Sequence, residues 1–144
     1  MKTKLIVLFL LGARLFAQGV PFELTSVSDV DKVFVDGYKP PASGSQLDLF
    51  GIRDEILSAQ CVVFAKADLN SVTVLTENLV GSGSTLFIPA GAVKYNFVEG
   101  IPLAVNSELT AGKSLLRRAP ALFPDYLSTK TSKSIAQGSY PSVW

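Results

Sequence analysis

The sequence predicts an all-β protein: a single β-sandwich of the jelly-roll or immunoglobulin-like kind, or a partly open barrel, with at most one short helix. Two observations predict this class. In several short runs, β-branched and aromatic residues alternate with polar ones, which is the period of a strand with one buried face. Glycine- and proline-rich turn signals separate these runs at intervals of about ten residues, which is typical of sandwiches and barrels.

The individual elements follow from the local patterns. Continuous apolar stretches predict two strands buried on both faces, at residues 61–65 and 85–88. Alternating runs predict strands with one buried face within residues 32–36, 72–76, 93–98 and 101–105. Turn-forming residues predict loops at residues 40–45 and 81–84. Residues 51–60 are the one helix candidate, because Ile52, Ile56 and Ala59 share a helical face, and a connecting turn is the alternative.

Residues 1–17 have the layout of a secretory signal peptide. Lys2 and Lys4 precede an apolar run at residues 5–11, and Ala17 offers a small residue for cleavage. The run is shorter than the roughly 20 residues of a membrane span, and Arg14 interrupts it, so we expect no span. Two outcomes stay open: cleavage, or retention as an apolar N-terminal arm. We expect an exported protein, extracellular or at the cell surface, or alternatively part of a virion.

Residues 18–118 form the predicted β-rich domain, and residues 119–144 are predicted to form an extended C-terminal arm. Pro120, Pro124 and Pro141 interrupt any regular element in this tail, and serine and threonine are frequent in it. Its aromatic residues are unusual for a disordered segment. We therefore expect the arm to dock, either on its own domain or on a neighbouring copy, with a frayed terminus as the alternative.

The charges are distributed unevenly along the chain. Residues 18–112 contain five basic and eleven acidic residues, whereas residues 113–144 contain five basic residues and one acidic residue. Opposite charges of this kind steer and orient the association of two copies. Arg117 and Arg118 form the densest basic spot, but the other basic residues of the tail are spread out. Nucleic-acid binding, which uses a more concentrated basic surface, is not expected.

The composition argues against an enzyme. The chain has no histidine, which removes the commonest general base and zinc ligand, and Cys61 is its only cysteine, so no intramolecular disulfide can form. The glycine-rich residues 81–84 lack the lysine of a phosphate-binding loop. Asp29 and Asp31 lack the remaining ligands of an EF-hand, and the adjacent acids Asp54 and Glu55 are expected to face solvent. We expect no catalytic residues, no cofactor and no metal.

The sequence instead favours a protein that binds other molecules. Candidate contact residues are aromatic residues of loops and tail, which can anchor an interface, and the basic pair: Tyr38, Arg117, Arg118, Phe123, Tyr126, Tyr140 and Trp144. The leading hypothesis is a non-enzymatic structural or adhesive subunit of an extracellular or virion-type assembly, associating with its own copies or with other subunits. The alternative is a monomeric exported module that binds a carbohydrate or another small ligand, with Tyr38 as a stacking ring.

Overall fold

The protein is built from antiparallel strands, as the sequence predicted. The computed structural model describes residues 19–37, 45–52, 54–81, 85, 87–107 and 115–144. Residues 1–17, the candidate signal segment, lie outside these ranges, as does Tyr38. Within them the elements are β1 Phe22–Val27, β2 Gln60–Ala65, β3 Leu69–Thr73, β4 Leu79–Val80, β5 Phe87–Ile88, the 3-10 turn η1 Ala90–Ala92, β6 Phe97–Leu103, β7 Ala121–Ser128, β8 Ser132–Ile135 and β9 Ser142–Val143.

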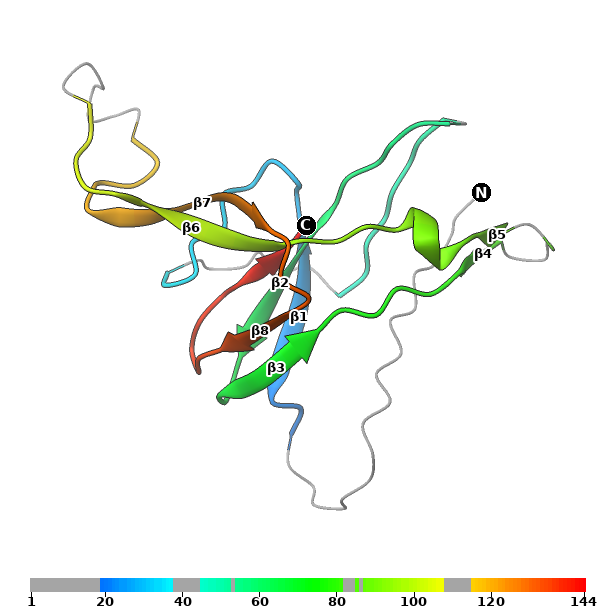
Figure 1. Ribbon diagram of the computed structural model, residues 1–144, viewed down its shortest axis with the longest axis horizontal. Helices are drawn as coiled ribbons and strands as arrows, with labels where there is room; N and C mark the ends of the chain where they lie inside the picture. The colour runs from blue at the N-terminus through cyan, green and yellow to red at the C-terminus, as the bar shows by residue number, and fades with distance from the viewer. Residues whose placement is uncertain (1–18, 38–44, 53, 82–84, 86, 108–114) are drawn as a thin grey trace.

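The strands of the described residues form three sheets. The main sheet has five strands in the order β1-β2-β9-β6-β7, and two-stranded sheets are formed by β3 with β8 and by β4 with β5. Figure 1 shows β1, β2, β3, β8 and β9 gathered in a central body. From this body β6–β7 projects to the left, β4–β5 to the right, and a loop formed by residues 45–59 to the upper right. The architecture is all-β and sandwich-like, with three projecting segments.

The core lies between the main sheet and the β3–β8 sheet. Val63 and Ala65 of β2 and Ile135 of β8 are buried together, and partly buried side chains of β1 and β3 pack against them: Phe22, Leu24, Leu69 and Val72. On the other face of β2, Val62 is also almost fully buried. The continuous apolar run at residues 61–65 therefore predicted β2 correctly, as a strand covered on both faces.

The last residues of the chain hold the main sheet together. In β9, Ser142 pairs with Val62 of β2, and Val143 pairs with both Cys61 of β2 and Phe97 of β6. The hydrogen bonds continue beyond β9, since Asn96 and Trp144 exchange two backbone bonds of 2.7 and 2.9 Å. We call residues 138–144 the closing segment, because β9 is the strand that connects β2 to β6.

Gln60, a buried polar residue, ties the closing segment to the turn at residues 28–31. The carbonyl oxygens of Ser28 and Asp31 are acceptors, so the amide nitrogen of Gln60 faces them, at 3.2 and 3.1 Å. Its amide oxygen then accepts a hydrogen bond of 2.9 Å from the Ser142 hydroxyl, which is also buried. Both buried side chains are satisfied, as buried polar groups must be.

The structure does not confirm the extended C-terminal arm. Residues 121–128, 132–135 and 142–143 form β7, β8 and β9 and pair with strands of the chain's own body. Pro124 had suggested an interruption, but β7 is an edge strand of the main sheet, where a missing N–H needs no partner on the outer side. The pairing of β6 with β7 shifts register between Glu99 and Gly100, so a bulge also accommodates the proline.

Three further predictions differ from the structure. Residues 32–36 are not a strand but a loop, in which Val33 and Phe34 are both buried. The run at residues 85–88 yields the strand β5, but its Phe87 and Ile88 are exposed rather than buried on both faces. The described part of residues 51–60 contains no helix, which leaves the connecting turn as the interpretation that fits, and η1 is the one helical turn of the described residues. None of the described helices has the length and apolarity that a membrane crossing requires.

The core position of Phe97 leads to a stability prediction. Phe97 is fully buried (0% exposed), whereas Phe87 of β5 is 58% exposed. Phe97→Ala is expected to lower the free energy of unfolding by about 3–5 kcal/mol because it leaves a cavity. Phe87→Ala, the matched control, should change it by less than about 0.5 kcal/mol. Urea unfolding followed by circular dichroism, at a low protein concentration, measures both, and equal effects would contradict this description of the core.

Candidate interaction surfaces

A loop with two buried residues, Val33 and Phe34, packs against β7 of the β6–β7 hairpin. We call residues 32–37 the clasp. Its Lys32 forms an ion pair of 2.5 Å with Asp125 of β7. The ring of Phe34 packs edge-on against Phe123 of β7, with a centroid distance of 5.3 Å and an interplanar angle of 80°. Such an edge-to-face contact is favourable for aromatic pairs. The clasp therefore holds β7 through both a charged and an aromatic contact.

Arg117 adds a third connection to the clasp. Its guanidinium carbon lies 4.2 Å from the centroid of the Phe34 ring, within the range of a cation–π interaction. The same guanidinium forms an ion pair with Asp36, and this hydrogen bond lowers the pKa of the Asp36 carboxyl from its ordinary value. It also lies so close to Gly37 that a Cβ atom there would be 2.7 Å from Nη2. Arg117 is thus a structural residue of this protein.

Tyr140 is also used within the molecule. Its ring stacks on Phe64 of β2, with centroids 4.8 Å apart and an interplanar angle of 17°. Its backbone N–H donates a hydrogen bond of 2.8 Å to the carbonyl of Val35 in the clasp. Tyr140 therefore joins the closing segment to both β2 and the clasp.

The seven candidate contact residues separate into three groups. Arg117, Phe123 and Tyr140 make the internal contacts described above. Arg118, Tyr126 and Trp144 are exposed. Tyr38 lies outside the described residues. The sequence thus identified aromatic and basic residues that make contacts. Three of the six described ones, however, make these contacts within their own chain.

The most extensive exposed surface is apolar, and sequence reasoning did not predict it. Among the described residues, nineteen large hydrophobic side chains are exposed and only seven hydrophobic residues are buried. Most of the exposed ones lie on the three projecting segments. On the loop at residues 45–59, which we call the arm, they are Leu49, Phe50, Ile52, Ile56 and Leu57. On and beside β4–β5 they are Leu75, Val80, Phe87 and Ile88. On β6–β7 and its ends they are Ile101, Leu103, Val105, Leu116, Leu122, Tyr126 and Leu127.

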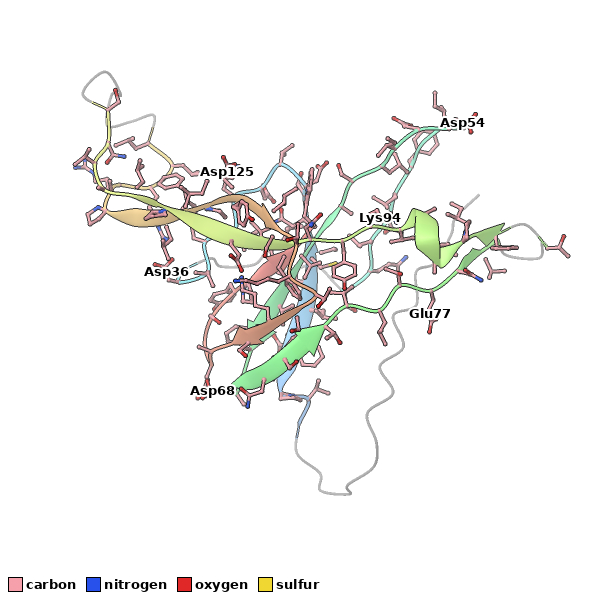
Figure 2. All side chains as sticks on the ribbon, in the orientation of Figure 1. Asp36, Asp54, Asp68, Glu77, Lys94 and Asp125 are labelled. Atoms are coloured by element: carbon pink, nitrogen blue, oxygen red, sulfur yellow. The ribbon has the colours of Figure 1, made fainter. Side chains whose placement is uncertain are left out.

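These side chains are exposed because of the topology. A two-stranded ribbon that leaves the body has no sheet packed behind it, so many of its apolar residues stay exposed among the described residues. Figure 2 shows the side chains of the three segments standing away from the body, with Asp54 at the end of the arm. Apolar clusters of this kind on a protein surface are typical of sites that contact another molecule.

A groove lined by both polar and apolar residues lies where the arm leaves the body. It has a volume of about 780 Å³ and is lined by residues of β1, the following turn and the two ends of the arm: Ser26, Val27, Ser28, Asp29, Asp31, Gln46, Leu47, Asp48, Leu49, Ser58 and Ala59. Asp29 accepts a hydrogen bond from Ser58. The described residues contain no group of three or more acidic, cysteine or histidine side chains placed to hold a metal ion. The described residues of this lining include no aromatic ring on which a sugar could stack.

Burial shifts the pKa values of two other groups. The pKa of the Cys61 thiol is raised, which disfavours the reactive thiolate. Burial also lowers the pKa of Lys133, whose amino group donates a hydrogen bond of 3.2 Å to the Val98 carbonyl. Nearby, Lys130 and Glu99 form an ion pair of 3.0 Å. Neither Cys61 nor Lys133 lines the groove. The pKa shifts of both groups follow from their burial in the packed protein.

No protein-family model matches the chain, and no curated protein matches it. The function is therefore argued from the residues and surfaces described above.

The two adjacent arginines allow a controlled test of the clasp. Arg117→Ala removes the contact with Phe34 and the ion pair with Asp36, and is expected to lower the free energy of unfolding by about 1–2 kcal/mol. Arg118→Ala, the matched control at an exposed position, should change it by less than about 0.5 kcal/mol. Urea unfolding of both variants measures the difference. A loss with Arg118→Ala as large as that with Arg117→Ala would contradict the structural role of Arg117.

The lowered pKa of Asp36 predicts a specific pH dependence. A carboxyl whose pKa is lower in the folded state stabilises the protein above its unfolded-state pKa, and this stabilisation is lost as the pH falls through the folded-state value. The stability difference between the wild type and Asp36→Asn should therefore be constant near neutral pH and shrink from about pH 5 to about pH 3. In an Arg117→Ala background the two should differ little at any pH. Urea unfolding across this range tests it, and a pH-independent difference would contradict the ion pair.

Proposed function

We propose that this protein is a non-enzymatic structural subunit that self-associates in an extracellular or virion-type assembly. The observation that carries the proposal is the apolar surface of the arm, β4–β5 and β6–β7. Monomeric soluble proteins rarely expose several apolar clusters of this kind, whereas subunits bury such clusters against one another. The contacts of the clasp and the closing segment support the same proposal, because they hold the β6–β7 hairpin in place.

The energetics favour association. Full burial of a large apolar side chain stabilises by roughly 1.5–3 kcal/mol relative to leaving it in water. Association costs about 4–15 kcal/mol in lost translational and rotational freedom. Covering the five exposed apolar residues of the arm gives a free energy of stabilisation as large as this cost of association. Covering the other two segments adds to it. Copies of the chain that cover one another's projecting segments are therefore expected to form stable complexes.

The alternative, a monomeric module for a carbohydrate or another small ligand, is supported less well. It leaves the apolar segments in water, and the described lining of the groove mixes polar and apolar residues and includes no aromatic ring. It would be favoured by a ligand that raises the melting temperature of a protein that stays monomeric.

Sedimentation velocity of the purified chain over about 1–100 µM tests the proposal, since micromolar dissociation constants correspond to about −8 kcal/mol. We expect a sedimentation coefficient that rises with concentration and a substantial oligomeric fraction at the upper end. Far-ultraviolet circular dichroism of the same samples confirms that the chain is folded. A folded monomer at every concentration would overturn the proposal and favour the small-ligand module.

A further inference from the structure

Strand β3 has an open edge. It pairs with β8 on one side, and in the described part of the chain no backbone hydrogen bond joins residues 72–77 to any segment other than β8. In an antiparallel pair each strand directs only part of its N–H and C=O groups towards its partner, so the others of β3 point outward. Figure 1 shows β3 at the lower margin of the central body, with β8 on its inner side. We call the outward side of residues 72–77 the β3 edge.

The β3 edge is regular from Val72 onward. The pairing with β8 shifts register between Leu69 and Val72, and Ser71 has a positive φ of 57°, so the irregularity is confined to the start of the strand. From residue 72 to residue 77, partly buried and exposed residues alternate, which is the period of an extended strand. Since Thr73 is the last residue that pairs with β8, the extended chain continues beyond the sheet that the molecule itself supplies.

The other edge strands of more than two residues carry features that discourage pairing with a further strand. On β7 this feature is Pro124, which has no N–H to donate. On β1 it is Glu23, in an ion pair of 2.6 Å with Lys66, and on β8 it is Lys133. Strand β3 has neither a charged residue nor a proline. An edge without such features is open to pairing with another chain.

A second copy of β3 fits this edge. Two identical antiparallel edges pair about a two-fold axis, so that each residue of one copy faces a fixed residue of the other. With the axis at Val74, Thr73 faces Leu75 of the second copy. In the same register Glu77 faces Ser71, so no two like charges meet. Thr73 and Leu75 are both exposed, Leu75 to 79%, and cross-strand contact gives each of them a neighbour.

We propose that two copies pair through the β3 edge, antiparallel and about a two-fold axis at Val74, so that the two β3–β8 sheets join into one sheet of four strands. This inference rests on the proposed function, self-association, and specifies one interface for it. A two-stranded sheet is at most marginally stable by itself, whereas a sheet of three or more strands is more stable. The pairing therefore stabilises the smaller layer of the body as well as joining the copies.

A charge-complementation experiment tests this pairing. One variant carries Thr73→Lys and Leu75→Lys, and a second carries Thr73→Glu and Leu75→Glu. Both positions are exposed, so both variants should unfold near the wild-type urea concentration. The control is Val30→Lys, which is 79% exposed like Leu75 but lies outside the β3 edge. Sedimentation velocity of each variant alone, and of the two same-charge variants mixed in equal amounts, measures association.

Each same-charge variant alone should associate at least about tenfold more weakly than the wild type, because the two-fold axis places its introduced charges opposite identical ones. In the mixture every introduced lysine faces an introduced glutamate, so association should return to about the wild-type strength. This rescue requires that the same two positions face each other across the interface. A β3 edge that docks on a different surface gives no rescue. The control should associate like the wild type.

The register has a test of its own. A variant with Thr73→Lys and Leu75→Glu places opposite charges face to face twice within a pair of identical copies, so it should associate about as strongly as the wild type. It carries the same number of substitutions as the double-lysine variant, at the same positions. An equal loss of association in both variants would contradict the axis at Val74.

Other results would overturn the inference in distinguishable ways. A wild type that associates while either same-charge variant associates equally well, or while the mixture stays weak, would overturn pairing through the β3 edge and leave the proposed function standing. Loss of association with Val30→Lys would overturn the assignment to this edge. A folded wild type that stays monomeric would overturn both proposals.

Discussion

The fold depends on a single short strand at the end of the chain. Ser142 and Val143 of β9 lie between β2 and β6, so β9 makes one sheet of what would otherwise be two separate ribbons, β1–β2 and β6–β7. A two-stranded ribbon alone is at most marginally stable in water. The hydrogen bonds between Trp144 and Asn96 and the buried pair of Gln60 and Ser142 hold this strand in place. Residues 138–144 are therefore part of the body.

The closing segment also determines how the β6–β7 hairpin is presented. Tyr140 binds the clasp through the Val35 carbonyl, and the clasp in turn contacts β7 through Phe34 and Phe123. The hairpin is thus held by the clasp and by the closing segment, which come from separate parts of the sequence. Several of its apolar side chains nevertheless stay exposed. A segment held in this way is suited to contact with another molecule.

The sequence predicted the elements whose signal is local and missed those that depend on position in the sheet. The apolar run at residues 61–65 is specific enough to identify a strand covered on both faces, and it is β2. Strand β7 was not predicted because a proline such as Pro124 would interrupt a central strand. It is tolerated in β7 because β7 lies at the edge of the sheet, and the order of strands in a sheet cannot be predicted from a local sequence pattern. Arg117 was recognised as important, but its partners Phe34 and Asp36 lie about eighty positions away, so its internal role could not be read from spacing. The exposed arm was mistaken for a helix candidate because its apolar spacing fits a helical face.

The small core and the apolar projections are two consequences of the same composition. Within the described residues seven hydrophobic residues are buried and nineteen large ones are exposed, because many of them lie in segments that leave the body. A core of this size stabilises a domain only modestly, since stability grows with the apolar area removed from water. Under the proposed self-association, contact between copies buries further apolar area that is presented by the folded state alone. Binding that is available only to the folded state shifts the folding equilibrium towards it, so assembly and folding would stabilise each other.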